Sequence, residues 1–101
     1  MRNNRRRRPT HPGEILREDV LPAARLTQDK LAKLMSRRTV SEILHERRPV
    51  TTDMAHRLAR AFGTVAGDVV RTQQRVDLWV MHRDRRKEYE KIKRIVTPKA
   101  A

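Results

Sequence analysis

Cysteine is absent from this 101-residue chain, and aromatic residues are scarce. Without cysteine there is no disulfide bond, thiolate metal ligand or cysteine nucleophile, a composition that fits a reducing compartment. The aromatic residues are Phe62, Trp79 and Tyr89, too few for a surface that binds single-stranded nucleic acid by base stacking. A disulfide-stabilised secreted scaffold and a single-strand stacking platform are therefore both disfavoured.

Long apolar runs are also missing. No stretch approaches the roughly 20 apolar residues of a membrane span. The basic N-terminus is not followed by the apolar segment that a secretory signal requires. We therefore expect no membrane insertion and a cytoplasmic location.

Catalytic and metal-binding patterns are not found in the chain. The three glycines are isolated at positions 13, 63 and 67, so there is no glycine-rich phosphate loop. No pair of the four histidines has a metal-ligand spacing with a third ligand nearby. No serine or aspartate belongs to a recognisable nucleophile motif. We predict that the protein is not an enzyme and has no cofactor or metal.

Basic residues, in contrast, are abundant: 25 Lys and Arg stand against 12 Asp and Glu, a formal net charge of +13. Residues 1–10 contain five Arg and no acid, and residues 82–101 contain eight basic and three acidic residues, so each end carries +5. This balance predicts a polyanionic partner, with nucleic acid first and an anionic membrane surface second. A coding bias toward arginine is the alternative explanation. We interpret residues 1–10 as a disordered basic arm that either neutralises phosphates or is a solvated tail.

Two short amphipathic helices are predicted between Leu26 and Val50. Thr27 can cap the first, and its apolar residues, Leu31, Leu34 and Met35, repeat at helical spacing. The second runs from about Arg38 to His45. Its apolar side contains Val40, Ile43 and Leu44, and its polar side contains Arg37, Arg38, Thr39, Ser41, Glu42 and His45. This pattern is typical of a DNA recognition helix, although an ordinary surface helix has the same periodicity.

Three further helices are predicted around this pair. Pro12 suits the first position of an N-terminal helix, which we expect to end at Pro22. Thr51 or Thr52 caps a later helix that Gly63 ends. From Val65 onward a longer helix follows, because the next proline is Pro98.

Several ordered motifs resemble one known family. They are His11–Leu16, Leu26–Gln28, Leu31–Ala32, Thr39–Leu44, Thr51–Thr64 and Asp77–Trp79. With these motifs the chain resembles the HigA-like antitoxins, which are helix-turn-helix repressors of the XRE superclass. The resemblance implies an all-α fold: a compact five-helix bundle of the lambda-repressor-like helix-turn-helix type with a long C-terminal helix. The expected organisation is a basic arm over residues 1–10, a DNA-binding domain over 11–80 and a charged helical extension and tail over 81–101.

One departure from the family pattern lies between the two short helices. The family usually reads Leu-Gly-Val-Ser-Arg there, whereas this chain runs from Met35 directly to Ser36 and Arg37. The glycine of that turn commonly adopts a left-handed conformation that ends the first helix. Without these two residues, we expect the first helix to end about half a turn early or the second to start later.

The resemblance implies a sequence-specific repressor that binds a palindromic double-stranded operator as a homodimer in the bacterial cytoplasm or nucleoid. It further implies the antitoxin of a type II toxin–antitoxin pair, which represses its own operon and neutralises a HigB-like ribonuclease toxin. The resemblance gives Gln28 a phosphate contact, and the Arg, Thr and Ser side chains of the second helix suit base edges or phosphates. The predicted DNA-binding residues are Thr27, Gln28, Arg37, Arg38, Thr39, Ser41, His45, Arg47 and Arg48. The predicted dimer interface contains Val69, Val76, Trp79 and Val80.

Two alternatives remain open at this point. The shortened turn could leave a degenerate helix-turn-helix that binds any nucleic acid through its basic ends, or the chain could bind only proteins. The net charge of +13 also opposes association with a basic toxin. Such a complex would depend on acidic residues such as Glu14, Glu18 and Asp19, or on apolar contacts.

Overall fold

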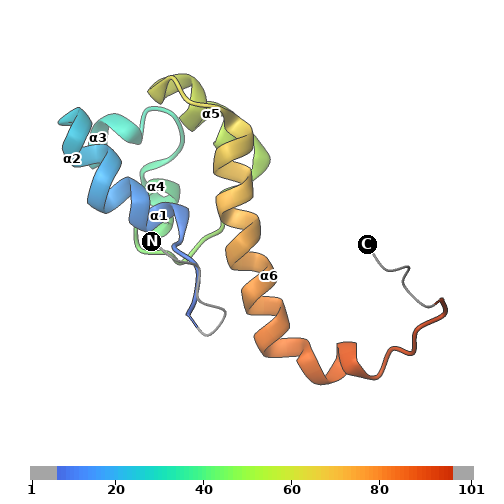
Figure 1. The fold of residues 1–101 in the computed structure, drawn as a ribbon. Helices are drawn as coiled ribbons and strands as arrows, with labels where there is room; N and C mark the ends of the chain where they lie inside the picture. The colour runs from blue at the N-terminus through green and yellow to red at the C-terminus, as the bar shows by residue number, and fades with distance from the viewer. Residues whose placement is uncertain (1–6, 97–101) are drawn as a thin grey trace.

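The computed structural model describes residues 7–96, and over this range the regular secondary structure is entirely helical (Figure 1). The first three elements are continuous and form one rod, so the described chain contains five helical rods, as predicted. The elements are α1 (Pro12–Ile15), the π-helix η1 (Leu16–Val20), α2 (Leu21–Ala24), α3 (Gln28–Leu31), α4 (Arg37–Leu44), α5 (Thr52–Phe62) and α6 (Ala66–Glu90).

The first rod passes through Pro22, where we had predicted its end. Its backbone widens to a π-helix over Leu16–Val20, which ends two residues before Pro22. Proline lacks an N–H, and in a regular α-helix its ring clashes with the carbonyl four residues earlier. The wider turn accommodates this gap in the hydrogen-bond ladder. The rod continues to Ala24 and ends at Arg25, whose φ of 54° is left-handed.

The boundaries of α5 follow its end residues. The Thr51 hydroxyl accepts a hydrogen bond from the Met54 backbone N–H at 3.2 Å and caps the helix. Gly63, with φ of 66°, ends it as predicted. The predicted long helix then begins at Ala66.

The core lies where the first rod, α4, α5 and the start of α6 meet. Val40 and Ile43 of α4 are its most completely buried large residues. The Gln73 side chain joins α6 to the loop after α4, accepting a hydrogen bond from the Val50 N–H at 2.9 Å and donating one to Asp77 at 2.9 Å. The loop that follows α4 is therefore fixed to α6.

The second half of α6 extends away from this core (Figure 1). Every residue from Met81 to Val96 is exposed, and the backbone departs from helical geometry at Arg85. The predicted C-terminal extension is thus helical to Glu90 and non-helical over Lys91–Val96. No helix of residues 7–96 combines the length and apolar character that crossing a bilayer requires. Residues 1–6 of the predicted arm and residues 97–101 of the tail lie outside the described residues.

Candidate nucleic-acid interface

α3 is short, and residues 32–36 link it to α4 through tight turns. Hydrogen bonds from Lys33 N to the Lys30 carbonyl (3.2 Å) and from Leu34 N to the Leu31 carbonyl (3.0 Å) form tight turns directly after Leu31. The start of α4 is intact, since the Ser36 hydroxyl accepts from Thr39 N at 3.0 Å. The early end of α3 therefore compensates for the two missing turn residues, and α4 keeps its N-terminal cap.

A side chain from α5 supports this shortened link. Arg57 donates to the Leu34 carbonyl at 2.9 Å and also pairs with Asp53 at 2.9 Å. Leu34 and Met35 no longer belong to a helix, yet they still pack partly buried against the core. The sequence reasoning missed Arg57, because an arginine on the polar face of a helix gives no sign of a carbonyl acceptor twenty-three residues away.

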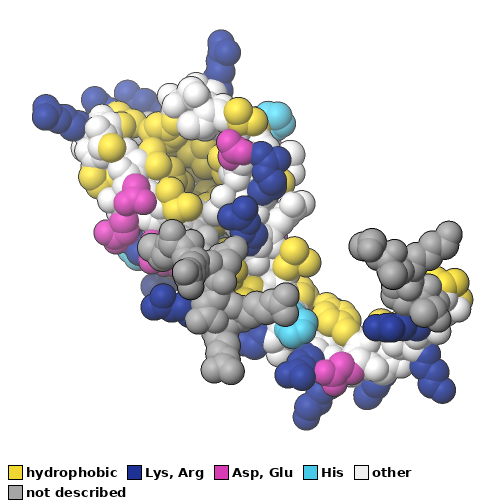
Figure 2. All heavy atoms as spheres, in the orientation of Figure 1, with side chains coloured by type: hydrophobic (Ala, Val, Ile, Leu, Met, Phe, Trp, Pro, Cys, Tyr) yellow, Lys and Arg dark blue, Asp and Glu magenta, His cyan; other side chains and the backbone are white. Residues whose placement is uncertain are grey.

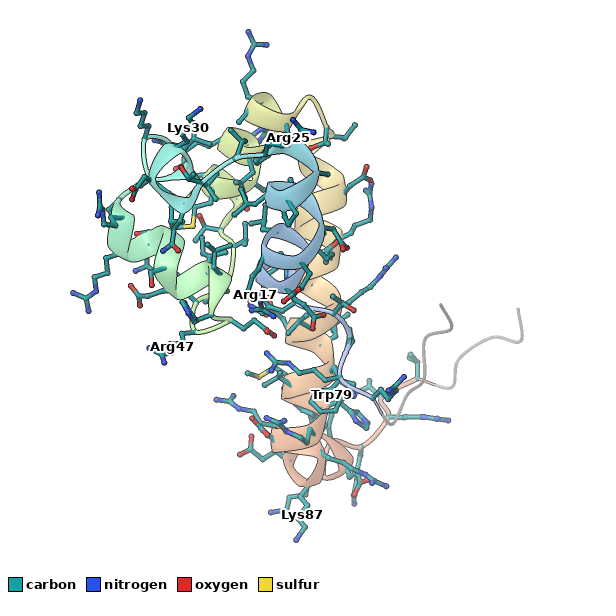
Figure 3. All side chains as sticks on the ribbon, turned by 90° about the vertical axis from the view of Figure 1, so that its left-hand side faces the viewer. Arg17, Arg25, Lys30, Arg47, Trp79 and Lys87 are labelled. Carbon is teal, nitrogen blue, oxygen red and sulfur yellow. The ribbon has the colours of Figure 1, made fainter. Side chains whose placement is uncertain are left out.

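The first rod holds the other end of α4. A Cβ built on Gly13 would lie 1.8 Å from the Ile43 carbonyl oxygen, so only glycine permits this approach of α1 to α4. Arg17 donates to the Leu44 carbonyl at 2.6 Å, which places a cation at the C-terminal end of α4. Figure 3 shows Arg17 between the first rod and α4. Neither role had been predicted.

The C-terminus of α4 closes in a Schellman motif without glycine. Glu46 N donates to the Ile43 carbonyl (3.0 Å), Arg47 N donates to the Glu42 carbonyl (2.8 Å), and Glu46 has a left-handed φ of 60°. His45 lies at the cap with its Nδ1 2.8 Å from the Ser41 carbonyl. Because a carbonyl only accepts, Nδ1 carries the proton, which leaves Nε2 available to a ligand.

The predicted DNA-binding residues divide into exposed groups and groups that brace the surface. Arg37 and Arg38 are exposed, with side-chain accessibilities of 78% and 89%, and make surface ion pairs with Asp29 and Glu42, both at 3.3 Å. Such pairs are weak and readily exchanged. Arg47 is also exposed, and Figure 3 shows it pointing away from the domain.

Thr39 and Arg48 hold each other. The Arg48 guanidinium donates to the Thr39 hydroxyl at 2.9 Å, and the Ser36 hydroxyl donates to the same oxygen at 2.7 Å.

Two of the predicted residues lie at the start of α3. The Thr27 hydroxyl accepts from Lys30 N at 3.3 Å and caps α3, and Gln28, like Ser41 of α4, is half-buried. Lys30, absent from the prediction, is exposed on α3 and points outward (Figure 3).

The predicted dimer residues occupy different environments on α6. Val76 is 3% exposed and Val69 packs against the core, so the protomer itself already covers much of both. Trp79 and Val80 are half-buried, with the Arg83 guanidinium 4.9 Å from the Trp79 ring centroid. The large apolar residues of this helix that are exposed are Leu78, Met81 and Tyr89. The predicted dimer interface contained neither Leu78 nor Met81.

The N-terminal segment reaches the same region. Arg8 lines a concave surface together with His11, Glu46, Arg47 and Arg48. His11 is buried and accepts from Gly13 N at 2.9 Å through its Nδ1. Burial lowers the pKa of His11 and Arg8 acts in the same direction, whereas Glu46 and Asp77 oppose the shift. Within the described part of the chain, no group of histidines and carboxylates is arranged to hold a metal ion.

A capped helix with exposed arginines, fixed at both ends and joined by a tight turn to a short preceding helix, defines a helix-turn-helix domain. No protein-family model matches the chain. The HTH-type transcriptional regulator YbaQ of Escherichia coli K12 is 38% identical over 86 residues, which are 83% of this chain and 76% of YbaQ.

Solved structures give the same assignment. The Pseudomonas aeruginosa antitoxin HigA with the higBA promoter has a TM-score of 0.81 and 34% identity, over 88% of this chain and 100% of that one. The antitoxin GraA in complex with its operator has a TM-score of 0.81 and 32% identity, over 96% of this chain and 99% of that one. The chain belongs to the HigA-like family of helix-turn-helix antitoxins and transcriptional regulators.

Proposed function

We propose that the protein is a sequence-specific, double-stranded DNA-binding repressor that recognises a palindromic operator as a homodimer. The observation that carries this proposal is the fixed position of α4. Arg57 supports the link before it, Arg17 supports its last turn, and Arg37 and Arg38 stay exposed at its start. The family relatives that were solved with a promoter or an operator support the same function.

The exposed arginines of α4 provide hydrogen-bond donors for DNA bases. With α4 in the major groove, Arg37 and Arg38 reach base edges, where guanidinium can donate two hydrogen bonds to guanine O6 and N7. His45, Arg47 and Gln28 contact phosphates, and the hydrogen bond between Thr39 and Arg48 fixes the loop after α4 against the first turn of α4. Phosphate contacts of this kind set the register of the protein on the duplex and carry no sequence information.

The same proposal includes an antitoxin role. The protein represses its own operon, acts in the cytoplasm or nucleoid, catalyses no reaction and neutralises a ribonuclease toxin. The family membership and the antitoxin structures support this part. A basic toxin would have to contact acidic residues, and Glu18 and Asp19 are exposed on η1 for such a contact.

Binding to DNA across a salt series tests the proposal. The wild-type protein should prefer the duplex upstream of its own gene over a scrambled duplex by at least about tenfold at about 150 mM salt, or about 1.4 kcal/mol. Arg38→Ala should erase this preference. Arg71→Ala is the matched control, because Arg71 is likewise exposed and pairs with an acid on its own helix, Asp68. Equal binding of both duplexes, with a steep loss of affinity in salt, would instead identify a non-specific electrostatic binder.

A further inference from the structure

The outward side of α4 carries an arginine and a glutamate that pair with each other. The buried side of this helix consists of Val40, Ile43 and Leu44. Arg38 and Glu42 lie four residues apart on the opposite side. Arg38 Nε lies 3.3 Å from Glu42 Oε1, and the Glu42 side chain is 30% exposed against 89% for Arg38. The carboxylate therefore has less room to move than the guanidinium, and the pair presents hydrogen-bond donors and an acceptor side by side.

The stability of α4 does not account for the order of this pair. Arg38 lies in the first turn and Glu42 near the end of the helix. The helix dipole favours the reverse order, with anions near the N-terminus and cations near the C-terminus. A pair of this spacing also stabilises a helix better when the glutamate comes first.

An acid on a DNA-binding surface is also unfavourable for general binding, because the phosphates repel it. Figure 2 shows Lys and Arg side chains spread from the domain to the far end of α6, so general attraction to DNA does not depend on this pair. A specific contact made by Arg38 and Glu42, rather than helix stability or net charge, therefore accounts for the position of the pair.

The geometry of the pair leaves the terminal fork of Arg38 open. Glu42 occupies Nε, and among the described residues neither terminal nitrogen of Arg38 has a partner. Arg37 differs, because its terminal nitrogen Nη2 lies 3.3 Å from Asp29 Oδ1. Arginine binds guanine O6 and N7 through two N–H groups at once. Arg38 is therefore the arginine that can bind guanine and keep its carboxylate partner.

We propose that Arg38 and Glu42 together recognise one G·C base pair in the major groove. A G·C pair presents two acceptors there, guanine N7 and O6, and then a donor, the cytosine N4 amino group. The fork of Arg38 matches the two acceptors, and the carboxylate of Glu42 accepts from the amino group. An A·T pair presents the adenine N6 donor to the fork and the thymine O4 acceptor to the carboxylate. Glu42 thus adds specificity chiefly by rejecting A·T.

This inference rests on the proposed repressor function, and Glu42→Gln tests it at one salt concentration. The variant keeps the size of the side chain and removes its charge. Its affinity for a scrambled duplex should rise, because an acid has left the surface near the phosphates. Its preference for the duplex upstream of its own gene over the scrambled duplex should fall at least about fivefold.

Glu90→Gln is the matched control for this measurement. Glu90 also pairs with an arginine four residues away, Arg86, at 2.8 Å, but it lies at the end of α6. The control should leave the ratio of the two affinities unchanged.

The two affinities separate the possible roles of Glu42. Equal increases for both duplexes would mean that Glu42 only repels DNA, and equal decreases would mean that it only holds α4 in place. Either result overturns the inference. A wild-type preference that Arg38→Ala erases and Glu42→Gln leaves intact would overturn this inference alone. A wild-type chain without operator preference would overturn the proposed function as well.

Replacement of each base pair of one operator half-site in turn gives an independent measurement. For the wild type, the exchange of one G·C pair for A·T should weaken binding at least about fivefold. Arg38→Ala and Glu42→Gln should both remove that penalty at the same position and keep the penalties elsewhere. Penalties lost at two different positions, or a Glu42→Gln profile identical to that of the wild type, would overturn joint recognition of one base pair.

Discussion

The protonation state of His11 affects how well the start of the first rod is capped. Its Nδ1 accepts the Gly13 N–H, and only the neutral ring can accept there. Its burial lowers its pKa, with Arg8 acting in the same direction and Glu46 and Asp77 opposing. Since the folded pKa lies below the ordinary value, the unfolded chain takes up a proton first as the pH falls. The stabilisation is therefore complete above about pH 6.5 and declines below it.

We expect this decline to depend on the titrating ring. His11→Asn keeps an acceptor at the N-cap position but cannot titrate. Chemical denaturation between about pH 8 and pH 5 should show wild-type stability falling relative to the variant below about pH 6.5. Parallel curves for the two proteins would show that His11 does not contribute to the pH dependence.

Gly13 controls how closely α1 approaches α4. Gly13→Ala would place a methyl group against the Ile43 carbonyl, so α1 must shift, and overpacking of this kind costs about 1–3 kcal/mol. Gly67→Ala is the control, because a Cβ there meets only the flexible end of Arg71, at 3.3 Å. Alanine inside a helix is about 0.5–1 kcal/mol more favourable than glycine. Thermal unfolding should therefore move in opposite directions for the two variants.

At the scale of elements, the α3–α4 link depends on a contact with a third helix. Arg57→Ala removes the donor to the Leu34 carbonyl and the pair with Asp53. Because Arg57 is about half exposed, water replaces much of this loss, and the expected cost is about 1 kcal/mol. The loss of operator-binding free energy should exceed the loss that partial unfolding of the variant accounts for, because the link positions the start of α4.

Arg60→Ala provides the comparison for this prediction. Arg60 is exposed one turn along α5 from Arg57, and its loss should leave both stability and operator affinity nearly unchanged. Equal effects of the two substitutions on operator binding would mean that α5 contributes only general positive charge. Denaturation and operator titration at one salt concentration separate these outcomes.

Several elements were predicted from local chemistry, and others were not. Thr27 caps α3 and Gly63 ends α5 as predicted, and of the two candidate caps for α5 it is Thr51 that caps the helix, because capping depends on residues within one turn. Pro22 does not end the first rod, because the preceding π-helix relieves the steric conflict. The sequence pattern of Leu31, Leu34 and Met35 also overstated the length of α3, since Leu34 and Met35 pack on the core from turns.

At the scale of the whole molecule, the net charge of +13 makes salt the main experimental variable. Each phosphate contact that is lost reduces the slope of log affinity against log salt by about one. Arg47→Ala should therefore weaken binding to operator and scrambled duplexes alike and lower the salt slope by about one. A change in the ratio of the two affinities would instead assign Arg47 to base recognition.

The sequence by itself determined the helical class, most helix ends, the family and the basic surface, because periodicity, caps and charge act over a few residues or over the composition. The tertiary structure decided how α4 is held and which face of α6 is free. Arg17, Gly13 and Arg57 act on carbonyls far along the chain, and Val76 is buried within its own protomer. Such contacts depend on which rods pack together, and spacing along one rod does not contain that information.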